Sequence, residues 1–172
     1  MKTIIVYKSQ TGFTKKYAEW IAQKIWATLL DYTKADISVL LEYDTIIYWW
    51  SLHAVGIQWI SLITKNFERL KQKKLIVFAV WASPIKDAVV KHVTAENFTE
   101  EQRKYIHFFY FRWWFNYKKL WIVDKIIMTI FIFVLKLKKH PKPDEKWMID
   151  AYDHPFDATN KQYIEWLVNI LK

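Results

Sequence analysis

The 172-residue sequence contains no cysteine and only two glycines, Gly12 and Gly56. Without cysteine the chain cannot form disulfides, hold an iron–sulfur cluster, bind zinc through thiolates or use a cysteine nucleophile. The shortage of glycine is more unusual, because chains that alternate strands and helices need glycine at tight turns and helix ends, where φ is often positive. The same sequence carries 11 tryptophans, and any interpretation has to explain both numbers.

Two further features bound the location and the partners. The N-terminus has no charged segment leading into an apolar run and a small-residue cleavage site, so we expect no signal peptide and a cytoplasmic protein. Lysine and arginine number 26 against 17 acidic residues, a formal net charge of +9. Such an excess indicates an anionic partner, which could be a membrane surface, nucleic acid or an acidic protein.

The apolar segments predict an α/β fold. A chain of this length suits one domain, 1–172, with a full core. Strands are expected at Thr3–Tyr7, Thr28–Tyr32, Asp44–Tyr48, Leu75–Val80 and Tyr105–Phe111. Helical patterns lie between them, including Ala18, Ile21, Ala22, Ile25 and Leu29 on one face, and a helix at about Ile57–Leu70. This alternation predicts a doubly wound, five-stranded parallel sheet of order 2-1-3-4-5.

Ligands of such sheets bind beyond the carboxyl ends of the strands. Three segments are expected to meet there: the loop after the first strand and the segments after the third and fourth strands. Their residues are Ser9, Gln10, Thr11, Gly12, Phe13 and Thr14; Trp49, Trp50, Ser51, Leu52 and His53; and Trp81, Ala82, Ser83 and Pro84. The first loop is rich in hydroxyls and precedes a helix N-terminus, which together predict an anion site.

The first of these loops carries a family resemblance. Ser9-Gln10-Thr11-Gly12-Phe13-Thr14 resembles the phosphate loop of flavodoxins, Ser/Thr-x-Thr-Gly-x-Thr, which directly follows the first strand. The resemblance implies that this loop holds the 5′-phosphate of FMN and that the other two segments flank the flavin ring. The alternative is an ordinary strand-to-helix turn capped by a threonine.

A closer resemblance is to the flavodoxin-domain group that includes menaquinone-dependent protoporphyrinogen oxidase. It rests on the turn Trp50–His53, on Val123–Met128, and on the acidic turn and helix Phe156–Leu171. It implies an FMN-dependent oxidoreductase with a quinone or another redox partner. Two alternatives stay open: an electron carrier of the flavodoxin type, and a binding protein of this fold that has lost FMN. Ordinary flavodoxins are acidic, which makes a net charge of +9 unusual for a carrier.

The sequence departs from these families where they carry glycine. Trp20 and Trp166 suit amphipathic helices, but the other tryptophans stand at expected glycine positions: 26, 49, 50, 59, 81, 113, 114, 121 and 147. Indoles beside the flavin would overfill the space that the backbone needs to approach the ring. Our hypothesis is that these tryptophans are an artefact of reading the codons of the gene with the wrong genetic code, because UGA encodes glycine in some bacterial codes and tryptophan in others. The rival hypothesis is that the tryptophans are real and that some stack on the flavin.

A basic amphipathic helix is expected after the fifth strand, at Lys118–Lys139 within an insertion at about 116–140. Its apolar run, Ile126–Leu135, is about 15 Å long as a helix, which is too short to cross a bilayer. Lysines on both sides favour docking on a membrane surface, where quinones are found. The alternatives are packing on the sheet or on a second copy in a homodimer. Arg112 could steer an acidic substrate or form a surface ion pair.

Other chemistry is weakly indicated. His53 could donate a hydrogen bond to the flavin or to a substrate, or lie at the surface. Asp150, Asp153, His154 and Asp157 resemble a solvated turn more than a metal site, so we expect no metal. Ser51 and Ser83 lack the flanking glycines of a hydrolase nucleophile. No nucleic-acid partner is expected, because the basic residues flank an apolar run.

Overall fold

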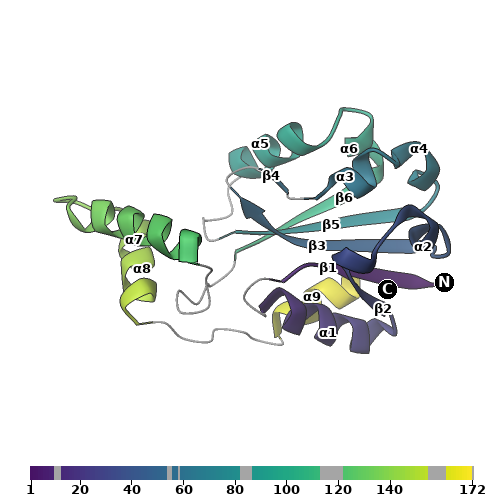
Figure 1. The fold of residues 1–172 in the computed structure, drawn as a ribbon, viewed down its shortest axis with the longest axis horizontal. Helices are drawn as coiled ribbons and strands as arrows, with labels where there is room; N and C mark the ends of the chain where they lie inside the picture. The colour runs from purple at the N-terminus through teal and green to yellow at the C-terminus, as the bar shows by residue number, and fades with distance from the viewer. Residues whose placement is uncertain are drawn as a thin grey trace.

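The computed structural model describes residues 1–9, 13–53, 56–57, 59–81, 87–112, 122–154 and 162–171. Five strands pair in parallel in the order β2-β1-β3-β5-β6. They are β1 (Thr3–Tyr7), β2 (Thr28–Asp31), β3 (Thr45–His53), β5 (Lys74–Trp81) and β6 (Ile106–Arg112). A two-residue strand, β4 (Gly56–Ile57), pairs antiparallel with the end of β3. The predicted doubly wound parallel sheet and its strand order are confirmed (Figure 1).

The strands are apolar on both sides because helices cover both faces of the sheet, and successive residues face opposite sides. Val6, Tyr48 and Val77 contribute to the core on one face, whereas Ile5, Ile47 and Phe78 contribute to the core on the other. The first face is covered by helices from the middle of the chain: α2 (Ile37–Leu41), α3 (Ser61–Thr64), α4 (Phe67–Leu70) and α5 (Asp87–Asn97).

Two helices from opposite ends of the chain cover the second face. Helix α1 (Phe13–Ile25) buries Tyr17, Ala18 and Ile21 against the sheet, and α9 (Gln162–Leu171) lies beside it (Figure 1). The two helices are joined by an ion pair between Lys24 and Glu165. Both side chains are partly exposed, so this pair contributes at most about 1 kcal/mol, and the apolar contacts hold α9 in place.

Some predicted boundaries are wrong. Strand β3 does not end at Tyr48 but continues to His53, because its ladder with β5 extends through Ser51 and Val80. The expected helix over 57–70 is divided into β4, α3 and α4, and the Asn66 side chain donates to the Leu62 carbonyl where α3 and α4 meet. Leu29, assigned to the first helix face, lies in β2. These segments share apolar spacing, so periodicity alone does not separate them.

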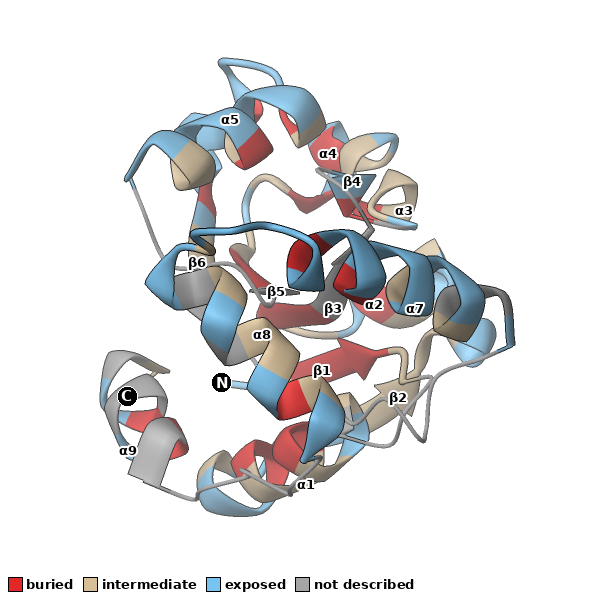
Figure 2. Cartoon of the chain, turned by 90° about the vertical axis from the view of Figure 1, so that its left-hand side faces the viewer, coloured by how far each residue is buried: buried red, intermediate tan, exposed pale blue. Residues whose placement is uncertain are grey.

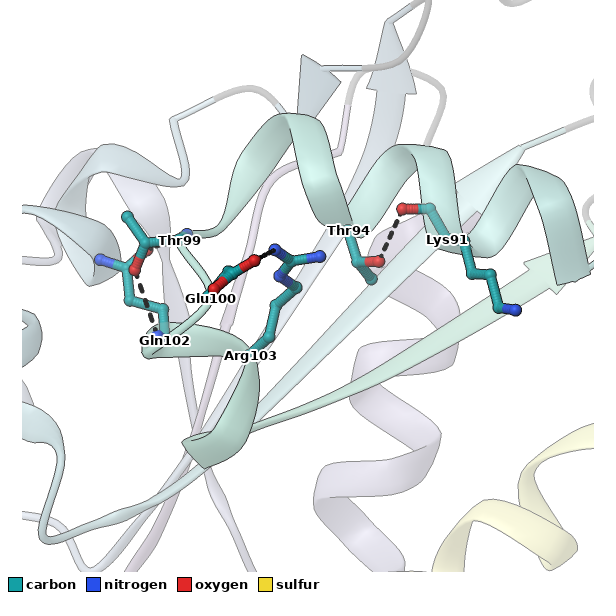
Figure 3. A network of polar contacts seen from close by, with 6 residues as sticks. All are labelled: Lys91, Thr94, Thr99, Glu100, Gln102 and Arg103. Atoms are coloured by element: carbon teal, nitrogen blue, oxygen red, sulfur yellow. Dashed lines mark hydrogen bonds and ion pairs between the residues drawn. The ribbon is translucent and has the colours of Figure 1, made fainter.

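A small polar network precedes β6, the last strand of the parallel sheet (Figure 3). The backbone N–H of Thr99 donates to the Gln102 side chain at 3.0 Å, and the N–H of Gln102 donates to the Thr99 hydroxyl at 3.2 Å. This reciprocal pair starts α6 (Gln102–Tyr105), directly before β6. The buried Gln102 amide also donates to the Thr64 carbonyl at the end of α3, which ties α6 to the middle of the chain.

Beyond β6, two helices form a hairpin: α7 (Ile122–Lys136) and α8 (Pro143–Asp153). Polar contacts join the helices, between Lys136 and Asp153 at 2.7 Å and between Lys138 and Glu145 at 2.6 Å. The added helix after the fifth strand is thus confirmed over Ile122–Lys136 and ends before the predicted Lys139, while residues 118–121 lie outside the described residues. The solvated turn expected at Asp150 and Asp153 is wrong, because both residues belong to α8. The hairpin projects from the rest of the fold (Figure 1).

Two tryptophans have a backbone conformation that favours glycine. Trp26 directly follows α1 and has φ 55°, and Trp59 has φ 61°. Both lie in the left-handed region, which costs a non-glycine residue roughly 1–2 kcal/mol. These are two of the positions where the sequence pattern predicts glycine.

Among the helices that the structure describes, none is long and apolar enough to cross a bilayer.

Candidate functional site

The carboxyl ends of the central strands form one edge of the sheet. Tyr7, at the end of β1, is in register with Trp49 of β3, which is in register with Phe78 of β5. Strand β3 then runs four residues further, while β5 and β6 end together at Trp81 and Arg112. The edge is therefore stepped. Strand β1 ends first, where the chain turns toward α1, and forms the low step, whereas β3, β5 and β6 extend further and form the higher steps.

Helix α1 begins at this low step with its N-terminus directed toward the edge. Phe13 is its first residue, and Thr14 in its first turn is half-buried. The first turn contains no acidic residue; instead it holds Lys15 and Lys16. Helix N-termini favour negative charge by about 0.3–1 kcal/mol, and no carboxylate of the first turn supplies it. The Lys15 ammonium is 3.8 Å from the Glu19 carboxylate, one turn further along the helix.

A charged pair lies next to the β1 end. The Lys8 ammonium is 3.7 Å from the Asp31 carboxylate at the end of β2. Asp31 also accepts the Thr33 backbone N–H at 3.0 Å and the Thr33 hydroxyl at 2.7 Å. The Thr33 backbone bond, followed by its hydroxyl and by Lys8, keeps the pKa of Asp31 below its usual value. Lys8 is therefore held beside the segment that joins β1 to α1.

The indole of Trp49 lies inside the fold. It is buried in the core between the sheet and α1, stacked on Tyr17 with ring centroids 6.4 Å apart and tilted against Phe78 at 4.9 Å. Such aromatic pairs add about 0.5–1.5 kcal/mol each beyond their burial. Its neighbour Tyr48 points to the opposite face and belongs to the other core.

Contacts with β4, α5 and Trp59 hold β3 in place near its end. Its hairpin partner β4 is anchored by Asn97 at the end of α5, whose side-chain oxygen accepts the Ile57 N–H at 2.7 Å and whose amide donates to the Val93 carbonyl. The Tyr48 hydroxyl donates to the Trp59 carbonyl at 2.9 Å. Burial raises the pKa of Tyr48, so this hydroxyl stays protonated and acts as a donor.

The predicted site residues fall into three groups. Ser9, Thr14 and Trp49 are described with their side chains; Ser9 and Thr14 are half-buried and Trp49 is buried. The backbone alone is described for Phe13 at the start of α1, Trp50–His53 in β3, Trp81 in β5 and Arg112 in β6. Gln10, Thr11, Gly12, Ala82, Ser83 and Pro84 lie outside the described residues.

Sequence reasoning missed three residues that shape this edge: Lys8, Asp31 and Asn97. For Asn97 a signal exists, because an asparagine at a helix end commonly bonds to nearby backbone. Within the described part of the chain, no cluster of three or more histidine, aspartate or glutamate side chains could hold a metal ion.

The fold and this edge define a class of protein: a doubly wound parallel α/β domain with an anion-favouring helix N-terminus after its first strand. The family model described as a flavodoxin domain matches residues 4–142. The chain therefore belongs to the flavodoxin domain family.

Solved structures of similar fold include three that each resemble part of this chain. The two-electron reduced flavodoxin of Megasphaera elsdenii is 15% identical, with a TM-score of 0.44, over 64% of this chain and 85% of that one. A flavodoxin from the domain Archaea is 18% identical, with a TM-score of 0.41, over 65% and 85%. The Trp repressor binding protein of Bacillus subtilis is 15% identical, with a TM-score of 0.44, over 64% and 81%. A search of curated protein sequences found no match.

The Asn97 anchor generates a stability prediction. Replacing Asn97 with alanine leaves the buried Ile57 N–H without its acceptor, which we expect to lower the free energy of unfolding by about 1–3 kcal/mol. The measurement is chemical denaturation followed by far-UV circular dichroism. The matched control is Asn66→Ala, which removes a donor to a helical carbonyl and should cost less. Equal losses in both variants would contradict the anchor.

Proposed function

We propose that the protein binds FMN at the carboxyl-terminal edge of the sheet and uses it for redox chemistry. The observation that carries the proposal is the N-terminus of α1, which follows the end of β1, has no acidic residue in its first turn and carries half-buried Thr14. In a flavodoxin domain this is the place where a phosphate would sit. A phosphate dianion there gains from the helix dipole and from the backbone N–H groups that the helix leaves unpaired.

The described residues fit the phosphate-bearing end of FMN. Ser9, Thr14 and, from the sequence motif, Thr11 would donate hydroxyls, and Lys8 would add positive charge while Asp31 holds it in position. The flavin ring would lie along the higher steps of the edge, between 50–53 and 81–84. Because the Trp49 indole packs beneath α1, it supports this edge from below and does not stack on the ring.

For the reaction, we favour a quinone-linked oxidoreductase. FMN supplies reversible two-electron transfer when bound. In one cycle the donor would lose two electrons and two protons, and a quinone would take them up and become a quinol. The chain's part is to hold the phosphate and to place the donor at the edge. Arg112 ends β6 beside Trp81, where its guanidinium suits the carboxylates of an acidic donor such as a porphyrinogen.

Two other functions compete with this one. An electron carrier would need the FMN edge and no substrate surface, whereas this chain adds the α7–α8 hairpin after β6, beyond that same edge (Figure 1). A binding protein without FMN is favoured only if bulky side chains at 50 and 81 fill the ring position. Flavin binding therefore has to be tested first.

The first test is FMN titration of the purified protein, followed by the two visible bands of oxidised flavin. Thr11→Ala should weaken FMN binding by about 1.5–3 kcal/mol, because it removes a hydrogen bond to a charged group. The control is Thr28→Ala, an exposed threonine at the other end of the sheet, which should leave the affinity unchanged.

Each variant is measured in the printed sequence and in a Trp50→Gly, Trp81→Gly background. Equal affinity of Thr11→Ala and the parent in a background that binds FMN would exclude this phosphate position. No flavin spectrum in either background would favour the binding protein.

The second test concerns the donor. With FMN-loaded protein under anaerobic conditions, Arg112→Gln should raise the KM for a porphyrinogen roughly ten- to hundredfold, as expected for a lost charged hydrogen bond. Reoxidation of the reduced flavin by a menaquinone analogue should be unchanged. Arg103→Gln is the control, because Arg103 pairs with Glu100 at the opposite edge. An unchanged KM would remove Arg112 from the donor site, and no turnover with any quinone would favour the electron carrier.

A further inference from the structure

Helix α7 is apolar on the side that faces away from the protein. Eight large apolar residues that contact solvent occur between its first residue and the position after its end: Ile122, Ile126, Ile127, Ile130, Phe131, Phe133, Val134 and Leu137. We call these eight residues the α7 ridge. Figure 2 shows α7 and α8 on the face turned toward the viewer, with much of α7 coloured as exposed. Large apolar side chains are stabilised by burial, so the ridge is costly to leave in water.

The ridge is continuous. Successive helical residues are about 100° apart, so these positions fill one arc of about 180° around the helix axis. The buried residues Ile132 and Leu135 lie on the opposite arc, where α7 packs against α8. The hairpin has therefore used one side of α7 for its own core, and the eight described ridge residues on the other side stay exposed. This rules out the predicted alternative in which α7 covers the sheet.

Lysines lie beside the ridge, on one side of it and beyond the end of the helix. Lys125 and Lys136 lie along one border of the arc, and Lys138, Lys139 and Lys142 follow the end of the helix. The carboxylates that pair with Lys136 and Lys138 come from α8, on the side away from the ridge. An apolar arc bordered by lysines matches the layers of an anionic bilayer surface, with acyl chains below and phosphates at the level of the ammonium groups.

We propose that the α7 ridge inserts into the surface of an anionic membrane, with the helix lying in the plane of the interface. The 15-residue helix is about 22 Å long, too short to cross the hydrocarbon core but enough to lie along it. The ridge sits beyond the edge where β3, β5 and β6 end (Figure 1). Docking would therefore bring that edge close to the bilayer, whichever reaction takes place there.

A second copy of the chain is the competing occupant. In a symmetric dimer the same surface is used twice. If the two α7 helices pack antiparallel, the lysine border of one ridge lies beside the lysine border of the other. A bilayer of anionic lipids instead supplies opposite charge to every one of these lysines. The net charge of +9 adds a long-range attraction to the same surface.

The test is flotation of the full chain with vesicles of phosphatidylglycerol and phosphatidylcholine, and with vesicles of phosphatidylcholine alone. We expect the protein to float with the anionic vesicles at low salt and to float less in their absence or at high salt. Phe131→Glu and Phe133→Glu, at positions 43% and 62% exposed, should reduce flotation at least tenfold. Tyr105→Glu changes a 45% exposed aromatic residue on α6, at the opposite edge, and should float normally.

Light scattering of the same proteins without lipid separates the two occupants. Monomers that float, with the two α7 variants remaining in the bottom fraction and folded by circular dichroism, support the membrane surface. Parent protein that stays in the bottom fraction overturns it. So does a parent dimer that Phe133→Glu converts to a monomer, because the ridge then belongs to a second copy.

A separate observation carries a second inference, about the tryptophans. Trp26 is 94% exposed with φ 55°, directly after α1. The next residue, Ala27, donates its N–H to the Ala22 carbonyl at 3.0 Å. This bond spans the last turn and is the helix ending that normally places glycine at the left-handed position. Trp59 is 57% exposed with φ 61°. Both residues are thus in a strained backbone position. Trp26 gains almost no burial in return, and Trp59 gains partial burial with a tilted ring contact to Tyr32.

We infer that glycine occupies positions 26 and 59 in the protein as its own cells make it, through a UGA codon read as glycine. Tryptic peptides of the native protein that cover 17–24, 25–34 and 35–65 test this directly. We expect tryptophan at 20, which packs edge-on against Tyr17 within α1, and glycine at 26 and 59. Tryptophan at 26 or 59 in the native peptides overturns the inference.

Denaturation gives a second readout in the printed sequence. Trp26→Gly should raise the denaturation midpoint, because it relieves the left-handed strain, whereas Trp20→Gly should lower it, because it puts glycine inside a helix and removes a ring contact. A midpoint that falls for Trp26→Gly as it does for Trp20→Gly would contradict the backbone argument.

Discussion

The parallel register of β1, β3 and β5 is the constraint on which the other features depend. Pairing Tyr7 with Trp49 and Trp49 with Phe78 sets where each strand ends, and therefore which residues can meet at the edge. The register also sends alternate side chains into two separate cores, so that Tyr48 and Trp49 serve opposite faces. A shift by one residue would exchange the cores and bury the wrong side of every strand. The site is thus a consequence of strand pairing before any ligand is considered.

The sequence predicted the strands and their order because a strand buried on both faces is recognised by its composition. The structure buries every residue of the apolar runs Ile4-Ile5-Val6 and Leu75-Ile76-Val77-Phe78. The sequence also located the edge, because the hydroxyl-rich loop follows the first strand. The length of β3 could not be predicted. Residues 49–53 stay extended because they pair with β5 and then with β4, and these contacts join residues distant in sequence.

The anchors of the site were hidden for the same reason. Asn97 supports β4 across 40 residues of chain, and the Gln102 amide reaches Thr64 across 38. The capping spacing of Thr99 and Gln102 does not indicate the contact with Thr64, and a polar side chain at a helix end has many local partners open to it. The α7–α8 hairpin shows the opposite case. Its charged run near Asp150 resembled a loop, but Lys136 and Asp153 join two helices there. A run of charged residues therefore predicts that a segment is exposed to solvent better than it predicts whether the segment is a loop or a helix.

Glycine and tryptophan differ most where the backbone has to turn left-handed or approach a ligand closely, and the structure distinguishes these demands. At Trp26 and Trp59 it is the positive φ that favours glycine. The Trp26 side chain is almost fully exposed, and Trp59 is 57% exposed with a tilted ring contact to Tyr32. At Trp49 the backbone is an ordinary strand and the indole has good ring partners, so the local geometry does not itself require glycine. If UGA is read as glycine, all of these positions become glycine together. Trp26 and Trp59 therefore test that reading, because their backbone conformation favours glycine. They carry a conformational cost that a tryptophan would have to offset with burial, and both side chains are exposed.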